Sequence, residues 1–206
     1  MTAKTHVSVG MASALLITHP KSIKELVLCL GVATIGSVIS DIDVSTSEAY
    51  EAVNKIIRFT LIATILLVFV DYNWNLGIIT SFKGNSNIMR SIVGIVVVFG
   101  ICIFGKNKPH RSFMHSILSV GLLSGAIYIV LPEIVPCFAI SMSSHILIDT
   151  LNKKRVHIFY PLKGGIAFNL CKANGIVNNI IFKVASSLTI ISLIYFTGEI
   201  LFNFLM

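Results

Sequence analysis

The chain has 206 residues, of which 55% are hydrophobic and only 12% are charged, and its mean hydropathy is +0.88. Ordinary soluble domains carry about 25% charged residues, so this composition argues against a water-soluble globule. The formal net charge of +7 comes from Lys and Arg in short connectors, without a basic stripe with interleaved aromatic residues, and this argues against a nucleic-acid partner.

Long apolar runs punctuated by Pro and Gly predict an all-α fold, a polytopic membrane helix bundle of about five to seven apolar helices. The whole chain, 1–206, is expected to form one integral-membrane domain. Several runs hold only about 15 strongly apolar residues, fewer than the roughly 20 of a perpendicular span, so those helices would tilt, extend into their flanks or be shielded by neighbours. In chain order, helices are expected near 5–18, 23–40, 56–71, 88–105, 113–131, 134–151 and 179–205, with polar connectors at 41–55 and 152–178.

The cysteines show no CxxC or disulfide spacing, and three of them lie inside apolar runs. We therefore interpret them as small core residues. The four are Cys29, Cys102, Cys137 and Cys171.

If successive helices run antiparallel, every polar cluster of the sequence reaches the same end of the bundle. Such a coincidence is hard to obtain by chance and predicts a shared site. The clusters are His6 in the first run, Asp41 and Asp43 after the second, the segment HRSFMHS (110–116) between the fourth and fifth, and His145 and Asp149 in the sixth.

Basic residues orient this end of the bundle. Because cytoplasmic loops carry an excess of Lys and Arg, the end that gathers the polar clusters is expected to face the cytoplasm. Of the 16 Lys and Arg residues, all lie on or near this end except Lys21, Lys24, Lys83 and Arg90.

Two acidic motifs in these clusters could bind a cation. His145 and Asp149 are spaced i, i+4, so they share one helical face and could hold one metal ion, although such a pair also arises as a helix-stabilising hydrogen bond. Asp41 and Asp43 would point apart within a helix but could converge in an irregular turn. A solvated loop is the alternative for these two, but carboxylates at a helix C-terminus oppose the macrodipole.

The segment HRSFMHS adds two imidazoles and a guanidinium. His110 and His115 are five residues apart, about 140° around a helix, so both could approach one centre only if His110 precedes the helix. Arg111 could clamp an anionic group such as a phosphate, and Ser116 could cap the helix or orient a histidine. His157 lies at the same end but outside the clusters.

Together these residues predict a metal centre at one membrane face, because ionisable groups at membrane depth are usually functional. Mixed His and Asp ligation suits zinc, with manganese or iron as alternatives. The candidate ligands are His6, Asp41, His110, His115, His145 and Asp149, and the candidate catalytic residues are Asp41, Asp43 and Arg111.

The ordered motifs resemble the YdjM family of bacterial inner-membrane proteins, which are classed as metal-dependent hydrolases. The resemblance covers about residues 1–165, the hydrolase-like core, and leaves 179–205 as a C-terminal membrane helix. It rests on Thr5-His6 with Gly10, Asp41-Ile42-Asp43, His110-Arg111 with His115-Ser116, Ser144-His145 with Asp149-Thr150, and Tyr160-Pro161.

More distantly, the motif order is similar to that of zinc-dependent phospholipase C and P1-type nucleases. This similarity implies that His6, His110 or His115, His145 and Asp149 are ligands, that Asp149 bridges two ions, and that Asp41 or Asp43 is a ligand or the base that activates water. Those enzymes use a further H-x-x-x-E motif, which does not follow Asp149 here. We therefore expect one or two divalent ions, Zn²⁺ first and Mn²⁺ second, rather than three.

The resulting hypothesis is an integral-membrane hydrolase that cleaves a phosphoester, in a lipid head group for example, at the cytoplasmic face of the inner membrane. Membrane lipids are the expected partners, because nearby Arg and Lys would attract anions. One alternative is a transporter that relays protons or metal ions, but the sequence offers few polar residues toward the opposite face. The other is a non-catalytic protein with a structural metal, although the candidate ligands and bases exceed the four of a closed structural zinc site.

Overall fold

The computed structural model describes residues 1–74, 76–77, 85–172 and 175–205, so Lys83, expected at the opposite end of the bundle, lies outside the described residues. Within these ranges the chain forms helices and no named strand, which confirms the predicted all-α class. The α-helices are α1 (Ala3–Thr18), α2 (Ile23–Ile39), α3 (Glu48–Trp74), α5 (Ser86–Lys106), α6 (Ile117–Val130), α7 (Val135–Asp149) and α8 (Ile176–Leu205), and the short 3-10 helices are η1 (Ser40–Asp43), η2 (Phe113–His115) and η3 (Pro132–Ile134).

Two helices, α3 and α6, begin four or more residues from their predicted starts, and serine caps explain both. Ser47 accepts a hydrogen bond from the Tyr50 amide at 3.0 Å, so α3 begins at Glu48 and part of the expected 41–55 connector is helical. Ser116 accepts one from the Ser119 amide at 3.2 Å, so α6 begins at Ile117 rather than near 113. The HRSFMH segment is therefore free of regular α-helix.

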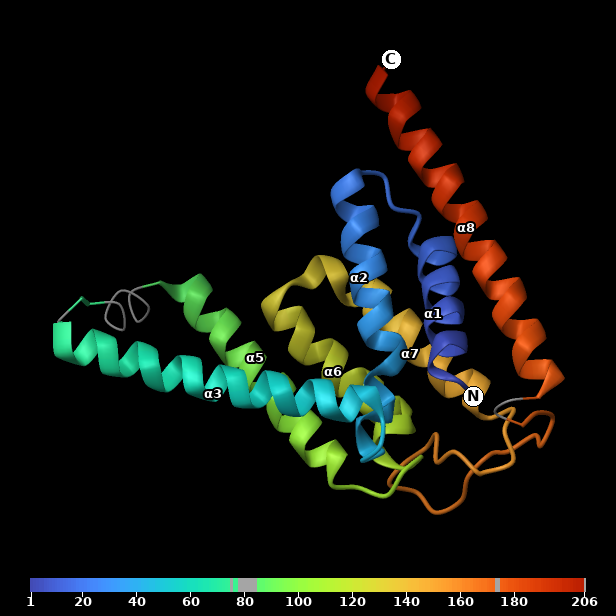
Figure 1. Cartoon of the computed structure of the whole chain (residues 1–206), viewed down its shortest axis with the longest axis horizontal. Coiled ribbons are helices and arrows are strands. Elements are labelled where there is room, and N and C mark those ends of the chain that lie inside the picture. Colours follow the sequence, from blue (N-terminus) through green and yellow to red (C-terminus); the bar gives the residue numbers. More distant parts are fainter. Residues whose placement is uncertain (75, 78–84, 173–174, 206) are drawn as a thin grey trace.

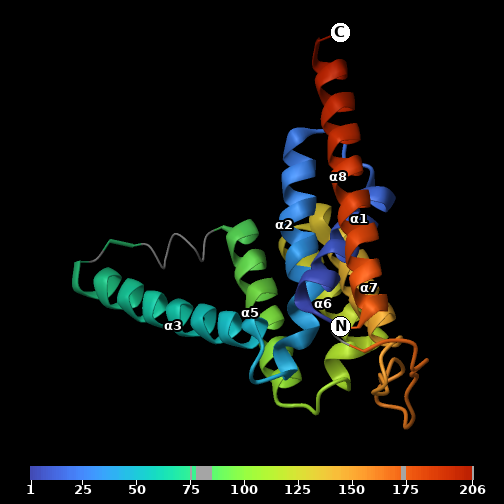
Figure 2. The ribbon, with the colours of Figure 1, turned by 45° about the vertical axis from the view of Figure 1, so that its right-hand side comes forward.

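Helix α7 lies at the centre of the bundle (Figure 1). Helices α1, α2 and α6 pack against it, α8 covers α1, and α5 covers α6. Helix α3 reaches away from the bundle in both views, contacts it mainly at η1, and buries none of its own side chains (Figure 2). An apolar helix so exposed requires an apolar surrounding, which a bilayer provides.

Among the described residues, four helical segments are long and apolar enough to cross a membrane: Ile23–Asp43, Glu48–Trp74, Ser86–Lys106 and Ile176–Leu205. Flanking residues extend α3 to 27 and α8 to 30 residues, as the short apolar runs required. The remaining helices α1, α6 and α7 have only 14 to 16 residues and lie against longer neighbours.

Small residues allow α1, α2 and α7 to approach one another closely. A Cβ atom at Gly10 of α1 would lie 3.0 Å from Ser37 Cβ on α2 and 3.2 Å from Ser141 Cβ on α7. A Cβ at Gly36 would lie 3.0 Å from the carbonyl oxygen of Phe138. Membrane helices pack through such small side chains, because lipid offers no hydrophobic drive for helix association.

This packing predicts that Gly10→Val separates α1 from α2 and α7. Overpacking of a filled interface costs about 1–3 kcal/mol, so the thermal unfolding midpoint in detergent should fall by several degrees. Gly31→Val on α2 is the matched control, because a Cβ there meets no atom within 4 Å. An equal effect of both substitutions would contradict the close packing at Gly10.

Candidate metal centre

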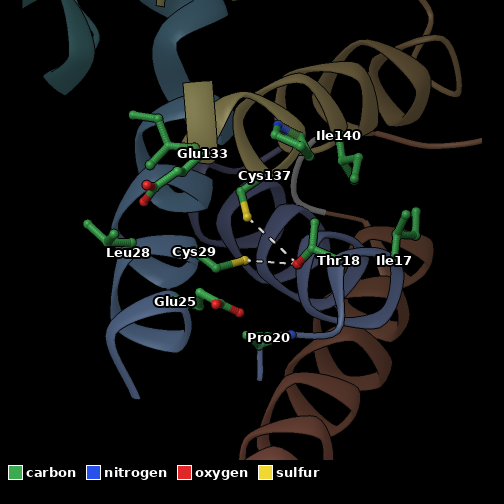
Figure 3. A pocket seen from close by; sticks show the side chains of 11 residues that line it. Ile17, Thr18, Pro20, Glu25, Leu28, Cys29, Glu133, Cys137 and Ile140 are labelled. Carbon is green, nitrogen blue, oxygen red and sulfur yellow. Dashed lines mark hydrogen bonds between the residues drawn. The ribbon is translucent and has the colours of Figure 1, made fainter. Parts of the chain in front are cut away.

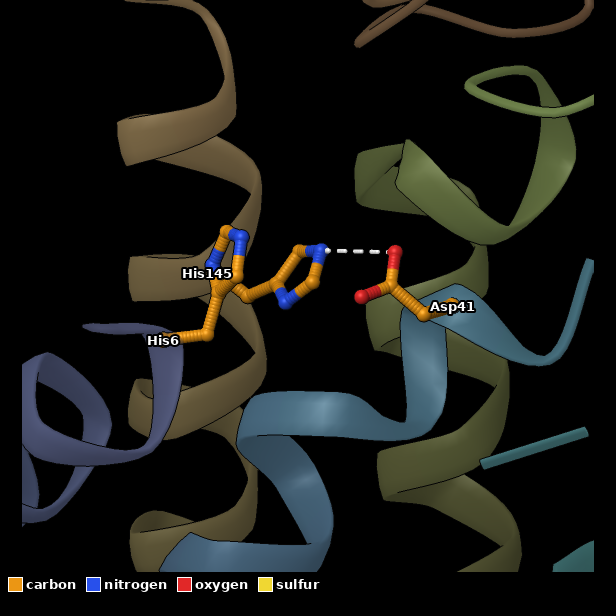
Figure 4. Close-up of side chains that lie close together, drawn as sticks. All are labelled: His6, Asp41 and His145. Atoms are coloured by element: carbon orange, nitrogen blue, oxygen red, sulfur yellow. Dashed lines mark ion pairs between the residues drawn. The ribbon is translucent and has the colours of Figure 1, made fainter. Parts of the chain in front are cut away.

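Four separate segments bring imidazoles and carboxylates to one end of the bundle. His6 comes from the first turns of α1, Asp41 and Asp43 from η1, His110 and His115 from the turn before α6, and His145 and Asp149 from the end of α7. Figure 4 shows two of the imidazoles and one carboxylate: the rings of His6 and His145 lie face to face, and Asp41 reaches toward His145 from the other side. Antiparallel threading of the sequence predicted this convergence.

The centre is formed by four atoms from two histidines and two aspartates. The Nε2 atoms of His115 and His145 are 3.3 Å apart, and Asp41 Oδ1 lies 3.6 Å from each of them. Asp149 Oδ2 lies 3.6 Å from His115 Nε2. Three of these side chains are almost fully buried, whereas the side chain of Asp41 is 23% exposed.

These separations fit the ligand spacing of a small divalent ion. Zinc binds nitrogen and oxygen at about 2.0–2.2 Å in a tetrahedron, whose neighbouring ligands are then about 3.3–3.6 Å apart. Among the described residues, three groups have ligand atoms within 4.8 Å of one another and could hold an ion: His115, His145 and Asp149; His6, Asp41 and His145; and Asp41, His110 and His115. The distances between these donor atoms therefore fit a bound metal ion.

The second nitrogen of each central histidine faces an oxygen atom. His145 Nδ1–H donates to the Ser37 carbonyl oxygen at 2.6 Å, which leaves the lone pair of Nε2 pointing at the centre. That carbonyl belongs to the last turn of α2, where helix carbonyls lack intrahelical partners. His115 Nδ1 lies 3.4 Å from Asp43 Oδ2. A partner on the outer nitrogen is what orients a metal-binding histidine.

Asp43 lies behind His115, on the side away from the four central atoms. Its side chain is fully buried, and it accepts hydrogen bonds from His110 Nδ1 at 2.8 Å and from the Arg111 amide at 3.1 Å. The buried position places Asp43 as a partner that orients the histidines and leaves Asp41 as the carboxylate at the centre.

His115 is the titratable group most affected by these carboxylates. Burial acts to lower the pKa of His115, but the carboxylates of Asp41 and Asp43, which lie 3.6 and 3.4 Å from its two ring nitrogens, outweigh this effect and raise the pKa to about 9. The raised pKa favours a protonated ring, which would balance part of the charge of these carboxylates.

Asp149 receives more donors than the other carboxylates. Its Oδ1 atom lies 3.3 Å from His6 Nε2, 3.1 Å from the Met1 amino group and 2.8 Å from Asn152 Nδ2. Its Oδ2 atom lies 3.3 Å from Arg111 Nη2. These donors fix the carboxylate beside His115 and compensate for its burial.

Arg111 does not extend into solvent, as an anion clamp would. Its φ of 66° turns the chain at this point, and the turn is held by the Asp43 carboxylate and by the His157 amide, which donates to the Arg111 carbonyl at 2.9 Å. The guanidinium contacts the Lys154 carbonyl at 2.6 Å and Asp149, while Nε is buried without a partner. Arg111 thus neutralises Asp149 in this arrangement.

The remaining candidate residues lie around the four central side chains or in the turn at Arg111. The His6 ring stacks on His145 with centroids 3.8 Å apart, and its Nδ1 is buried without a hydrogen-bond partner. The side chain of His110 is 34% exposed at the edge of the centre. Ser116 serves as the α6 cap, and His157 contributes its backbone amide to the turn at Arg111.

The sequence interpretation missed three supporting groups. The Ser37 carbonyl has no sequence signal, because any residue would supply it. Asn152, three residues after Asp149, is a C-terminal extension of the H-x-x-x-D motif that the sequence shows. The connector after α7 folds back through the Phe168 amide, which donates to the Thr150 carbonyl at 2.7 Å, and so keeps Lys154 over Arg111.

The fold and this centre define a helical membrane protein with a buried cluster of histidines and aspartates. The family model of the YdjM inner membrane protein matches residues 1–204, so the chain belongs to that family and is an inner-membrane protein. Neither the curated proteins nor the solved structures include a match to the chain.

The position of Asp43 predicts that Asp43→Asn weakens metal binding without removing a ligand. Loss of such an orienting partner typically lowers metal affinity about 10–100-fold. Competition with a chelating dye would measure the affinity, and saturating zinc should still fill the site. Loss of binding even at saturating zinc would instead make Asp43 a direct ligand.

Proposed function

We propose that this protein is an integral-membrane, metal-dependent hydrolase that crosses the inner membrane several times. The observation that carries the proposal is the set of four donor atoms of His115, His145, Asp41 and Asp149, 3.3–3.6 Å apart between neighbours and mostly buried. More donors surround this set than a closed structural site requires, which favours catalysis.

Zn²⁺ is the favoured ion and Mn²⁺ the second candidate, because imidazole and carboxylate ligands suit both. A bound divalent ion supplies Lewis acidity and lowers the pKa of water. His115, His145 and Asp149 would hold it, with His6 packed behind His145. An occupancy near two ions per chain would assign Asp41 and His110 to a second ion, since these two form a further group with His115.

Asp41 is the residue we assign as general base. Its carboxylate faces the centre and has the largest exposed fraction of the four central side chains, so it can accept a proton from water that enters from solvent. His110 is the other partly exposed group, and Asp43 fixes its ring through Nδ1. We assign His110 as the donor of a proton to the leaving oxygen.

A phosphoester is the proposed substrate, in the head group of a membrane lipid. Exposed basic side chains lie on the connector after α7, whose Lys154 carbonyl contacts Arg111, and would attract an anion. They are Lys153, Lys154, Arg155 and Lys163. The site lies at one end of the helices, where a head group meets the bundle while the acyl chains remain in the bilayer.

The cytoplasmic face is the proposed location of the site. The positive-inside rule supports it, because the described connectors at this end carry most of the Lys and Arg residues. Lys21 and Lys24, in contrast, lie at the opposite end, beside the start of α2.

The test combines metal content with hydrolysis in detergent-purified protein. Wild type prepared with excess zinc should contain one to two ions per chain by mass spectrometry and release head groups from mixed phospholipid vesicles. His145→Ala should lose both properties. Asp41→Asn loses the base but leaves His115, His145 and Asp149 in place, so we expect it to retain metal while head-group release falls at least about 100-fold.

His19→Asn is the matched control, because His19 lies at the far end of α1 and asparagine tolerates its φ of 47°. This variant should keep metal and activity. Wild type without stoichiometric metal would overturn the metal centre. A metal-loaded protein that releases no head group, but carries divalent ions into proteoliposomes, would replace hydrolysis by transport.

A further inference from the structure

A second group of reactive side chains lies at the opposite end of the bundle from the metal centre. Cys29 of α2 and Cys137 of α7 line a cavity of about 320 Å³, together with Thr18 at the end of α1 (Figure 3). Both sulfur atoms point at the same hydroxyl: Cys29 Sγ lies 3.5 Å and Cys137 Sγ 3.7 Å from Thr18 Oγ1. The side chains of the two cysteines also interact with each other.

The Thr18 hydroxyl donates its own hydrogen to a backbone carbonyl and not to either cysteine. Its Oγ1–H donates to the Ala14 carbonyl at 2.8 Å, so its oxygen lone pairs are free to accept from both thiols. The cysteines are 2% and 7% exposed and belong to one core cluster formed by α1, α2, α7 and α8. The geometry therefore holds two thiols from different helices on one acceptor.

Cys29 and Cys137 lie at the same level because α2 and α7 keep one register along their length. Ser37 and His145, which share a hydrogen bond, are 108 positions apart in the sequence. The same offset separates Cys29 from Cys137 and Asp41 from Asp149. Both helices run toward the metal centre, so equal offsets keep the partners level along about 12 Å of helix between His145 and Cys137.

We propose that Cys29 and Cys137 are a redox-active thiol pair, which a low-molecular-weight disulfide oxidises to a bridge between α2 and α7. The spacing of cysteines in the sequence gave no sign of such a pair, because the partners come from helices that are distant along the chain. Cys102 on α5 and Cys171 near Asn152 lie elsewhere, each without a cysteine partner among the described residues.

The reaction is an ordinary thiol–disulfide exchange. The thiolate of one cysteine attacks the oxidant disulfide RSSR, forms a mixed disulfide and expels one RS⁻, which is protonated to RSH. The thiolate of the other cysteine attacks the mixed disulfide, forms the Cys29–Cys137 bond and expels the second RSH. The two cysteines lose two electrons and two protons, and RSSR gains both.

The cavity gives the oxidant an approach from the membrane surface remote from the metal centre. Glu25 and Glu133 also line it, and Glu133 pairs with Lys24 at 3.5 Å. With the metal centre at the cytoplasmic face, as proposed above, the cysteines face the compartment in which disulfides persist. A bridge there ties together the two helices whose other ends hold Asp41, His145 and Asp149.

Oxidation of the full-length protein in detergent with cystamine tests the proposal. After acid quenching and denaturation, alkylation with a polyethylene-glycol maleimide should label two thiols in oxidised wild type and four after dithiothreitol. Intact mass of the oxidised wild type should show the loss of two hydrogens and no added cysteamine. The mass measurement needs no variant, so it stands even if a substitution prevents folding.

Two pairs of serine variants separate a bridge from independent reactions. Cys102→Ser and Cys171→Ser should keep the loss of two hydrogens, whereas Cys29→Ser and Cys137→Ser should abolish it. Addition of cysteamine to Cys29 or Cys137 in wild type without a bridge would overturn the proposal. So would four free thiols after oxidation.

Discussion

The hydrogen bond from His145 Nδ1 to the Ser37 carbonyl, 2.6 Å long, fixes the geometry on which the rest of the centre depends. It joins α7 to the last turn of α2, turns Nε2 of His145 toward the centre and sets the register of the two helices. The bond is reachable only because Gly10, Gly36 and Ser141 leave the helices in close contact. Small side chains thus bring the helices close enough for His145 to reach the Ser37 carbonyl, and such small residues are common where membrane helices meet.

Charge balance is the second constraint. Asp41, Asp43 and Asp149 are carboxylates within or beside a buried cluster, and each would be costly there without compensation. Arg111, His6 and Asn152 compensate Asp149, while His110 and His115 compensate Asp43. The carboxylates of Asp41 and Asp43 raise the pKa of His115, and a divalent cation at the centre would balance the same carboxylates.

The sequence predicted the convergence of the site because its polar clusters lie at alternate ends of successive apolar runs. Antiparallel threading of these runs brings all of the clusters to the same end of the bundle. Helix limits were less predictable, since the Ser47 and Ser116 caps decide where α3 and α6 begin. The division between Asp41 at the centre and Asp43 behind His115 depends on the 3-10 turn η1, which a D-x-D pattern does not specify. The Cys29–Cys137 proximity depends on the register of non-consecutive helices, which only tertiary packing sets.

The central claim is that Nε2 of His115, Nε2 of His145 and the carboxylate of Asp149 bind one ion together, with the carboxylate of Asp41 facing that ion. X-ray absorption spectroscopy of the zinc-loaded, detergent-purified protein tests it most directly. The account predicts a shell of nitrogen and oxygen atoms at about 2.0–2.2 Å, with scattering from about two imidazole rings that decreases in His115→Ala. A sulfur shell at about 2.3 Å, or a spectrum unchanged in His115→Ala, would place the metal elsewhere and contradict the account.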